Sequence, residues 1–444
     1  MIQKLIPAIL AFSTQSSAAD RPNILWLTCA DHVTSTFMNL RALILASAFA
    51  TSTLVAADWP AWRGPTADGH AAPGQKLPVK WSESENLIWK AAVRGRGHGS
   101  PIIIGDQVLL ATADVETEEQ LVLSFDRATG KSRWESVVHR GNLNTKGHKI
   151  SSQASSDVVS DGERLFVNFL NNGAVFTTAL DLTGKQLWQR RVCDFQVHQG
   201  FGSSPVIHQN IVLVSADHRG GGKMTGLNKL TGEIVWQQGR PPVANYATPG
   251  VVTAAGKVQA VLAGCNKVES FDPLTGKKLW SIDGSTEETV VTAVTDGSRV
   301  FLGGGYPKRH TMAVEADGSG KIAWENVTQT YVPTMIVKSG HVFAVGDAGR
   351  AVCWHSATGE ERWNEKVDRE FYGSPVMADS RIYVTSKSGV TSVFEATPEK
   401  FTLLGQNPLG DESFSTPAIC DNRLYLRSAK TGSTRQEFLW CIGE

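Results

Sequence analysis

The chain has 444 residues, of which 43 are basic and 43 acidic, so its formal net charge is zero. Hydrophobic residues make up 41% and charged residues 19%, a composition that argues against a disordered chain and against a coiled coil. The neutral balance also argues against a nucleic-acid-binding protein, because such proteins usually carry a basic excess. The 42 glycines and 13 tryptophans are unusual, and glycine at this level indicates many turns between short strands.

Two segments at the N-terminus have the composition of secretory signal peptides. Residues 1–20 and residues 38–57 each combine a basic residue, an apolar stretch and a small-residue cleavage site. We therefore expect residues 1–37 to be a stray segment with a signal-like start and residues 38–57 to be the working signal peptide. The mature chain would then begin near Asp58. The alternative is an uncleaved membrane anchor, although the second apolar stretch is short for a bilayer span.

The stretch between the two signals has a resemblance of its own. Residues 20–32 resemble the opening strand of secreted sulfatases, in which an acidic residue near Asp31 helps to bind the metal. No Cys-x-Pro-x-Arg or Ser-x-Pro-x-Arg nucleophile motif occurs in the chain, so the rest of a sulfatase is missing. This supports the interpretation of the first 37 residues as a fragment joined upstream, or as the product of a wrongly chosen start.

Export implies an oxidising compartment, and we expect a periplasmic or secreted protein with no transmembrane span in the mature chain. Of the six cysteines, only Cys29 precedes the expected mature start, and no two cysteines are close neighbours in the sequence. The odd number that is left requires at least one free thiol. We expect buried single cysteines rather than a disulfide framework.

A phrase made of an apolar run, Asp, Thr-Gly-Lys or Thr-Gly-Glu, and Trp recurs roughly every 45 residues, a period typical of propeller repeats. A complete copy is Phe271-Asp-Pro-Leu-Thr-Gly-Lys-Lys-Leu-Trp280, and a worn copy without Trp spans residues 394–404. Glycine supplies a turn with positive φ between two strands, and we expect each Trp to pack against the neighbouring module. These tryptophans are therefore expected to be structural rather than a stack for a cofactor. They are Trp89, Trp134, Trp188, Trp236, Trp280, Trp324 and Trp363.

A second phrase alternates with the first and consists of a small residue, often Pro, an apolar run, a turn and another apolar run. Its eight copies begin near Ser100, Ser155, Ser204, Thr248, Thr289, Val332, Ser374 and Thr416. Together the two phrases give about four antiparallel strands in each module, which is one propeller blade. The sequence therefore predicts an all-β, eight-bladed β-propeller over residues 58–444, with seven blades as the alternative. The strand around Trp89 has no inner strands before it, so we expect it to complete the last blade and close the ring.

The repeat resembles that of the pyrroloquinoline-quinone (PQQ)-like β-propeller family. The Asp-x-x-Thr-Gly-Lys-x-x-Trp copies carry the resemblance over residues 80–444, and residues 58–65, Asp-Trp-Pro-Ala-Trp-Arg-Gly-Pro, are similar to the start of secreted members. The resemblance implies eight blades and two kinds of relative. Quinoprotein dehydrogenases bind the quinone and calcium at the centre of the ring. Non-enzymatic members include the propeller subunit of the outer-membrane protein assembly machine and sensor domains.

The sequence departs from the dehydrogenases in several places. It has no adjacent Cys-Cys pair, no Asp-x-Asp phrase in the propeller and no Cys-x-x-Cys-His haem site. It also lacks a Gly-x-Ser-x-Gly nucleophile elbow, and its glycine runs are not followed by the Lys-Ser/Thr of a phosphate-binding loop. These departures weigh against catalysis of the alcohol-oxidising type, although they leave open a quinone in another geometry.

The loops that precede the first strand of each blade are polar and aromatic, and they converge on the central channel. Such a convergence predicts a ligand-binding mouth, although water-filled channel mouths collect polar residues in any case. No local metal-ligand spacing is present, so no metal site is assigned; zinc is disfavoured and calcium stays open. A second polar group combines Tyr306-Pro-Lys-Arg-His310 with Asp217-His-Arg219. The expected mouth residues are Arg96, His98, His148, Lys149, His198, Gln199, Tyr246, Glu288, Tyr331, Tyr372 and Glu412.

Two functions follow from these observations. The first is an exported, non-enzymatic propeller that presents its loops as a scaffold for an envelope or extracellular protein, or for a small-molecule ligand. The alternative is a PQQ-dependent alcohol or sugar oxidoreductase with the quinone at the channel mouth, where His148, Lys149 and His198 would polarise the quinone or substrate. A hydrolase or lyase at the mouth is a third and weaker interpretation. No nucleic-acid partner is expected, and no cofactor is predicted, with PQQ and calcium left as candidates.

Overall fold

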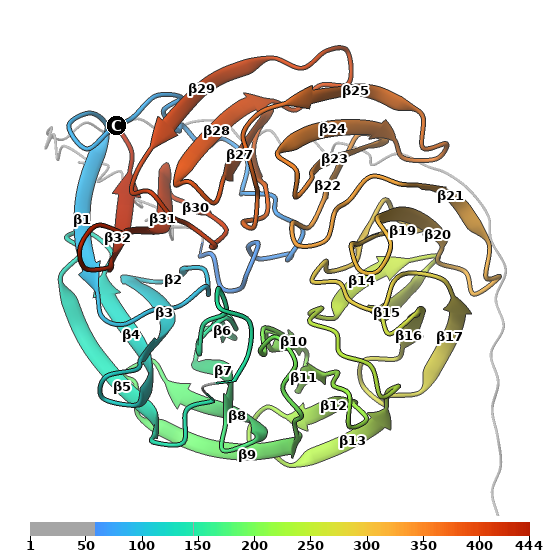
Figure 1. The fold of residues 1–444 in the computed structure, drawn as a ribbon, viewed down its shortest axis with the longest axis horizontal. Helices are drawn as coiled ribbons and strands as arrows, with labels where there is room; N and C mark the ends of the chain where they lie inside the picture. Colours follow the sequence, from blue (N-terminus) through green and yellow to red (C-terminus); the bar gives the residue numbers. More distant parts are fainter. Residues whose placement is uncertain (1–57, 145) are drawn as a thin grey trace, which may run out of the picture. The chain divides into compact units, whose positions relative to one another are not determined.

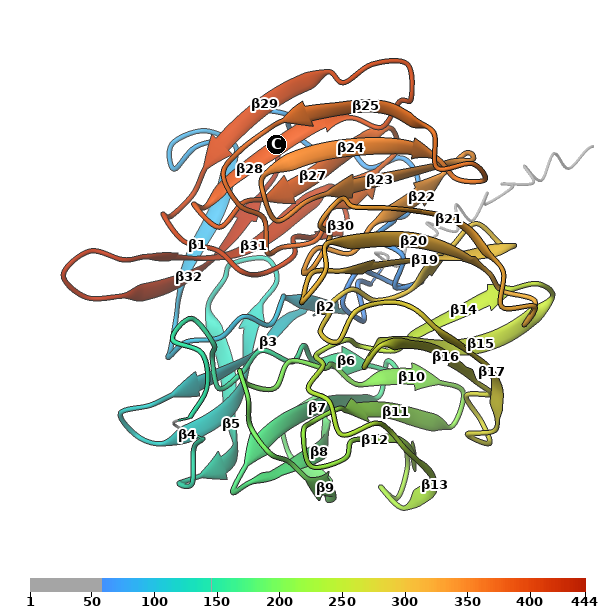
Figure 2. The same cartoon turned by 45° about the vertical axis from the view of Figure 1, so that its right-hand side comes forward.

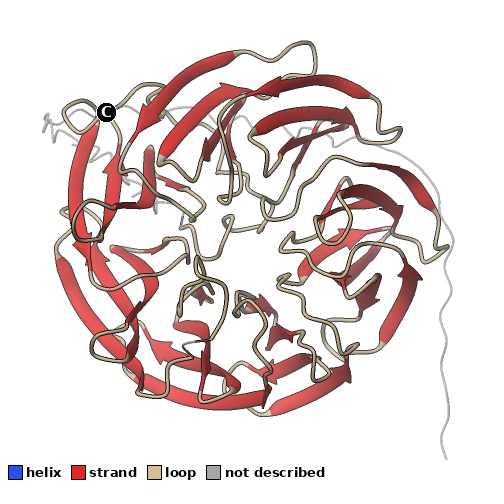
Figure 3. Cartoon of the chain, viewed as in Figure 1, coloured by secondary structure: helices blue, strands red, loops and turns tan. Residues whose placement is uncertain are grey.

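The computed structural model describes residues 58–444 apart from residue 145. In this part of the chain the structure contains strands and no helices, and the strands form eight four-stranded antiparallel sheets. The sheets are arranged as blades around one axis (Figure 1 and Figure 3). The prediction of an all-β, eight-bladed propeller is therefore confirmed. The predictions for residues 1–57, including the signal peptide, lie outside the described residues.

We number the blades in chain order from the inner strand outward. Blade 1 contains β2 (Ile102–Ile104), β3 (Gln107–Asp114), β4 (Glu119–Asp126) and β5 (Ser132–Arg140), and blade 2 contains β6 (Val159–Ser160), β7 (Arg164–Asn171), β8 (Ala174–Asp181) and β9 (Gln186–Asp194). Blade 3 contains β10 (Val206–His208), β11 (Ile211–Ala216), β12 (Lys223–Asn228) and β13 (Ile234–Gly239), and blade 4 contains β14 (Gly250–Ala254), β15 (Lys257–Gly264), β16 (Lys267–Phe271) and β17 (Lys278–Asp283).

Blade 5 contains β18 (Val294–Thr295), β19 (Arg299–Gly304), β20 (His310–Glu315) and β21 (Ile322–Asn326), and blade 6 contains β22 (Ile336–Lys338), β23 (His341–Val345), β24 (Arg350–His355) and β25 (Glu361–Lys366). Blade 7 contains β26 (Val376–Ala378), β27 (Arg381–Thr385), β28 (Val390–Glu395) and β29 (Leu403–Pro408), and blade 8 contains β30 (Ala418–Cys420), β31 (Arg423–Lys430), β32 (Gln436–Ile442) and β1 (Leu87–Val93).

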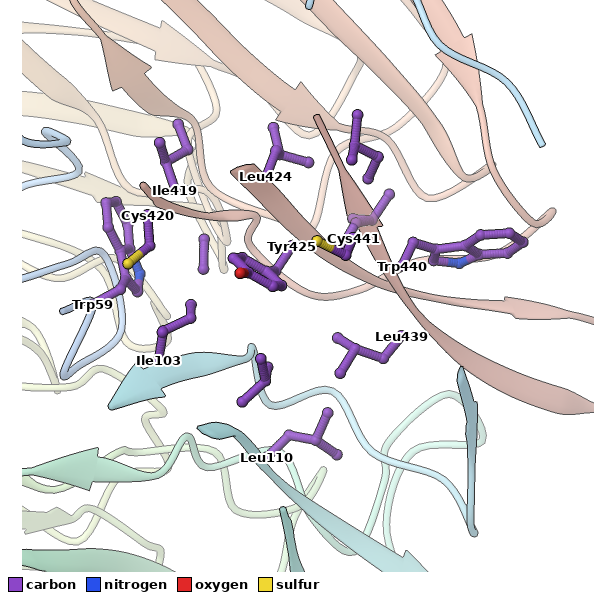
Figure 4. Packing of buried hydrophobic residues seen from close by; sticks show 14 of the residues in the cluster. Trp59, Ile103, Leu110, Ile419, Cys420, Leu424, Tyr425, Leu439, Trp440 and Cys441 are labelled. Carbon is purple, nitrogen blue, oxygen red and sulfur yellow. The ribbon is translucent and has the colours of Figure 1, made fainter. Parts of the chain in front are cut away.

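The ring is closed as the sequence predicted, because the N-terminal strand β1 is the outer strand of blade 8. It pairs antiparallel with β32, with Trp89 opposite Cys441 and Ala91 opposite Leu439. The closure brings together a buried cluster that includes Trp59, Tyr425 and Trp440 (Figure 4). Burial of these large aromatic side chains between blades stabilises the seam.

The seven repeated tryptophans lie in blades 8 and 1 to 6, and each packs against the blade that follows it. The glycine of the Thr-Gly turn has positive φ, for example +69° at Gly276, and the ring of the preceding Trp lies against it. Several of the indoles also donate a hydrogen bond to the next blade, as Trp324 Nε1 does to the carbonyl of Ser356 at 2.8 Å. The phrase therefore specifies both a turn and a contact between blades.

Within each blade, the turn between the second and third strands and the loop to the next blade lie at one end of the ring. We call this end the mouth face. In blade 8 the corresponding turn joins β31 to β32, a hairpin that extends outward (Figure 2). The short turn between the first two strands and the Thr-Gly turn lie at the opposite end.

The segment that precedes β1 crosses the end of the channel opposite the mouth face (Figure 1). Trp59 forms a β-bridge with Ile103 of blade 1, and His70 forms one with Met377 of blade 7. Between them, the fully buried Arg63 donates from Nη2 to the carbonyl of Met335, next to blade 6, at 2.6 Å. This segment therefore covers one end of the channel and leaves the mouth face as the opening.

Candidate functional site

The channel contains a cavity of about 410 Å³ that is floored by Trp62 of the N-terminal segment. The indole Nε1 of Trp62 donates to Thr416 Oγ1 at 3.1 Å, which fixes the ring in the cavity lining. A cavity of this volume lies within the range of small-molecule pockets. Its lining comprises Trp62, His98, Ser100, His148, Ile150, Ser151, Ser155, Asp157, Gln199, Gly200, Phe201, Gly202, Ser204, Tyr246, Thr248, Val290, Tyr331, Val332, Asp347, Tyr372, Ser374, Phe414 and Thr416.

The structure brings about half of the expected mouth residues to this cavity. Those in its lining are His98, His148, Gln199, Tyr246, Tyr331 and Tyr372. Those outside the lining are Arg96, Lys149, His198, Glu288 and Glu412. Lys149 is exposed, and Arg96 donates to the carbonyl of Ile150 at 3.1 Å. Glu412 forms an ion pair with Arg435 away from the axis.

Glu288 lies behind the cavity wall and organises three of the expected residues. It is 2% exposed and accepts hydrogen bonds from Gln199 Nε2 at 2.8 Å and from Tyr331 Oη at 3.1 Å. His198 Nε2 lies 3.3 Å from its other carboxylate oxygen. Burial and the nearby Glu288 carboxylate raise the pKa of the Tyr331 hydroxyl, so this group stays a donor at neutral pH. Glu288 therefore positions the polar wall around Gln199 and Tyr331.

A ring of hydrogen bonds surrounds the cavity and was not predicted from the sequence. Each blade has one equivalent residue just before its inner strand. At seven of the eight junctions, the side-chain oxygen of this residue accepts a hydrogen bond from the backbone N–H of the equivalent residue in the preceding blade. Between blades 4 and 5 the pattern differs, because Thr292 Oγ1 donates to the carbonyl of Thr248 at 3.1 Å. The ring is formed by Ser100, Asp157, Ser204, Thr248, Thr292, Thr334, Ser374 and Thr416. It links all eight blades near the axis.

Asp157 is the acidic member of this ring, in which the other seven positions are Ser or Thr. Its carboxylate accepts the backbone N–H of Ser100 and, at 2.9 Å, the hydroxyl of Ser204. Burial raises the pKa of Asp157 to about 6. A second carboxylate in the lining, Asp347, accepts the backbone N–H of Tyr331 at 3.0 Å, and burial raises its pKa to about 6 as well. The wall therefore holds two carboxyl groups whose ionised form is disfavoured by burial.

The aromatic part of the wall includes His98, which stacks on Phe414 with 4.1 Å between ring centroids. Tyr372 meets the same phenyl ring edge-on at 5.3 Å. Burial, together with the positive charge of Arg96, lowers the pKa of His98 well below its usual range, so the imidazole is neutral at pH 7. This side of the cavity thus presents aromatic surface without positive charge.

Other features of the described chain bear on cofactors and on the membrane. Within residues 58–444, with 145 left out, no three His, Cys, Asp or Glu side chains converge closely enough to hold a metal ion. In the same part of the chain, no helix is long and apolar enough to cross a membrane. Cys193, Cys265, Cys353 and Cys441 have free thiols; Cys265, Cys353 and Cys441 are buried as expected, whereas Cys193 is half-buried.

The sequence of this propeller matches the model of one protein family, described as outer membrane protein assembly factor BamB. The matches cover residues 63–196, 118–345 and 313–400, which together span well over half of the chain. The chain belongs to this family.

A curated relative and several solved structures are similar to the chain. Outer membrane protein assembly factor BamB of Nitrosomonas eutropha is 26% identical over 281 residues, which is 63% of this chain and 54% of the relative. The chain thus spans about half the length of this relative. The crystal structure of BamB from Moraxella catarrhalis has a TM-score of 0.58 and 15% identity, and covers 80% of this chain and 99% of that chain.

The propellers of quinone enzymes share the same fold. A europium-containing methanol dehydrogenase has a TM-score of 0.63 at 11% identity, covering 87% of this chain and 98% of that one. The quinohemoprotein alcohol dehydrogenase of Comamonas testosteroni has a TM-score of 0.58 at 12% identity, covering 86% of this chain and 80% of that one. Identities this low show the shared fold and nothing finer.

The cavity wall fits PQQ poorly. The quinone is a tricarboxylate, and a buried anion requires cationic partners. The cavity lining of the described chain contains no Lys or Arg, and it contributes the carboxyl groups of Asp157 and Asp347 instead. Two like-charged groups in the wall would oppose a bound polycarboxylate. We therefore derive no reaction step through a quinone.

Proposed function

We propose that this chain is an exported, non-enzymatic propeller that acts as a binding scaffold in outer-membrane protein assembly. The observation that supports this most strongly is the family match over residues 63–400, with a curated relative and a solved structure both named as the assembly factor BamB or as BamB. The partner would be an envelope protein that docks on the loops of the mouth face. Periplasmic placement follows from this role and from the expected signal peptide.

The mouth face of blade 5 offers a docking surface with the chemistry of a protein interface. Tyr306 is 54% exposed and Val327 is 81% exposed, and Lys308 and Arg309 are exposed beside Tyr306 in the sequence. Tyr and Arg are among the side chains that most often dominate binding energy in protein interfaces. We call Tyr306, Lys308, Arg309 and Val327 the blade-5 patch.

The blade-5 patch is held by the same group of residues that builds the wall of the cavity. The backbone N–H of Glu288 donates to the carbonyl of Tyr306 at 3.1 Å, which anchors the turn that carries the patch. A loop fixed in this way loses little conformational freedom on binding, which favours affinity. The patch is therefore suited to a stable contact with a partner protein.

Site-specific photo-crosslinking in the native cell tests this proposal. A photoreactive amino acid at Tyr306 or Val327 should crosslink to an envelope protein of the outer-membrane assembly process, identified by mass spectrometry. The matched control is Leu230, which is 57% exposed but lies in the Thr-Gly turn of blade 3 at the opposite end. The double variant Tyr306→Ala/Arg309→Ala should reduce partner recovery at least tenfold, because such anchors contribute about 2 kcal/mol each.

Two results would contradict the scaffold proposal. One is the same crosslinking pattern from Leu230 as from Tyr306, which would show that the mouth face has no special role. The other is PQQ-dependent oxidation of alcohols or sugars by the purified chain, which would favour the dehydrogenase alternative.

A further inference from the structure

We infer that the channel cavity binds a small organic cation of the quaternary-ammonium class. This inference goes beyond the scaffold function, because the cavity lies inside the ring and the proposed protein contact lies on the exposed loops. It depends on the composition of the wall: aromatic rings, buried carboxyl groups and no Lys or Arg side chain in the lining that the structure describes.

The aromatic rings surround the cavity on its floor and on several sides. A positive charge is attracted to the face of an aromatic ring within about 6 Å, and cages of such rings are the usual way in which proteins recognise quaternary ammonium groups. Here the rings come from the N-terminal segment and from the loops before blades 3, 4, 6, 7 and 8. They are Trp62, Phe201, Tyr246, Tyr331, Tyr372 and Phe414.

The carboxyl groups in the wall lack a cationic partner at hydrogen-bonding distance. Asp157 is bonded to Ser100 and Ser204, and Asp347 to backbone N–H groups of Tyr331 and Val332. Ionising a buried carboxyl group without a counter-charge is unfavourable. A ligand that brings a positive charge into the cavity would offset this cost, whereas an anionic ligand would increase it.

The cations that stand near the wall are already engaged elsewhere. Arg427 is buried and bonded to Glu437 at 2.7 Å, and Lys387 is paired with Glu370 at 2.8 Å. Lys387 Nζ lies 5.5 Å from the centroid of Tyr372, so this ring already has a cation against it. Neither Arg427 nor Lys387 is hydrogen-bonded to Asp157 or Asp347, so a cationic ligand could take that place.

A neutral sugar is the strongest competing ligand, because hydroxyl groups and aromatic rings would also suit it. Two probes that have the same shape but differ in charge distinguish a cation site from a sugar site. Choline and 3,3-dimethylbutan-1-ol have nearly the same size and shape, but only choline carries a positive charge. A site that recognises a cation should bind choline more tightly than the neutral alcohol. A site that recognises shape and hydroxyl groups should bind the two with similar affinity.

Isothermal titration of the purified full chain with each probe tests the inference. We expect choline to bind at least tenfold more tightly than its neutral isostere, which corresponds to about 1.4 kcal/mol. Asp157→Asn and Asp347→Asn should each weaken choline binding about tenfold and leave binding of the isostere unchanged. The control Asp283→Asn removes a carboxylate whose side chain is 90% exposed, and it should have no effect.

Several outcomes would overturn the inference. Equal affinity for choline and the isostere would show a neutral site, and tighter binding of PQQ than of choline would show an anion site. No heat from choline up to about 10 mM, well above the millimolar range of weak specific binding, would show no cation site. If an Asp→Asn variant fails to fold, as judged by circular dichroism, the comparison of the two probes on the unmodified chain still decides the question.

Discussion

The indole of Trp236 in blade 3 lies directly on Gly276 in the Thr-Gly turn of blade 4. A β-carbon built on Gly276 would come within 2.5 Å of the ring, closer than real β-carbons approach other atoms. The same relationship joins Trp89 to Gly130 and Trp188 to Gly232. The glycine in the repeat is thus required twice, for the positive φ of the turn and for the space that the indole of the preceding blade occupies.

Replacing Gly276 with Ala should therefore destabilise the propeller more than the backbone angle alone would. Gly256 is a matched control, because its φ is +72° against +69° at Gly276, and no atom lies within 4 Å of the position that a β-carbon would take there. We expect Gly256→Ala to cost about 1 kcal/mol and Gly276→Ala about 1–3 kcal/mol more. Urea unfolding of both variants measures the difference, and equal losses would show that the indole can move aside.

The buried Asp157 should make stability depend on pH in a defined direction. Burial raises its folded-state pKa from 3.8 to about 6, so between these values the folded protein binds more protons than the unfolded chain. The contribution of this group to the free energy of unfolding must then fall as pH rises from 4 to 7. Relative to Asp157→Asn, the unmodified protein should lose about 2–3 kcal/mol over that interval.

Denaturant unfolding of both proteins at pH 4, 5, 6 and 7 checks this expectation. Groups that are common to both proteins, including Asp347, cancel in the difference. A difference that stays constant with pH would show that Asp157 titrates in the folded state as it does in the unfolded chain.

The buried ion cluster of Arg240 should contribute more to stability than the exposed pairs. Arg240 is fully buried and binds both oxygens of Asp217, at 3.0 and 2.9 Å, as well as Glu269. Arg240→Met would leave the buried Asp217 carboxylate without a cation, which costs about 3–5 kcal/mol, whereas Glu269 keeps its ion pair with Lys278. Lys267→Met breaks the exposed pair with Asp283 and should leave stability almost unchanged, because water screens that pair. Thermal unfolding of the two variants measures the contrast, and similar losses would contradict it.

The thiols should differ in their reactivity. Burial raises the pKa of Cys193 to about 11 and that of Cys353 and Cys441 to about 12, but Cys193 is only half-buried and the other two are fully buried. The native protein at pH 8 should therefore be labelled slowly, and first at Cys193, because the thiolate is the reactive form. Peptide mapping by mass spectrometry locates the label, and faster labelling of Cys353 would contradict the burial described above.

The repeat made the fold predictable, because each copy contains the apolar runs that form strands and the Thr-Gly pair that forms a turn. The Thr-Gly turns and the tryptophans lie where the pattern placed them, and the unpaired strand around Trp89 closes blade 8 as expected. Local sequence could specify this much because each blade contacts mainly its neighbours. A repeated local pattern therefore determines most of the structure.

The cavity was only partly predictable. Its polar rim could be found because the loops before each inner strand must meet at the axis, which is how His98, Gln199 and Tyr331 were recognised. Trp62 was missed because it comes from a segment outside the repeat that crosses the channel. Asp157 was missed because the blade-2 copy of the second phrase was taken to begin at Ser155, two residues too early. With the eight copies aligned on the residue that forms the hydrogen-bonded ring, Asp157 would have stood out as an acidic residue where the other copies have Ser or Thr.

The pairing of β1 with β32 also constrains the time course of folding. The first strand of the propeller is an outer strand whose partner is the last one synthesised, and Trp62 reaches Thr416, 354 residues away in the sequence. Contacts between such distant residues form slowly, because long loops must close first. An incomplete chain would expose an open sheet edge at each end and invite association with other chains. The ring can therefore be completed only after β32 has been synthesised, and a truncation that removes β32 would lose the seam as a whole.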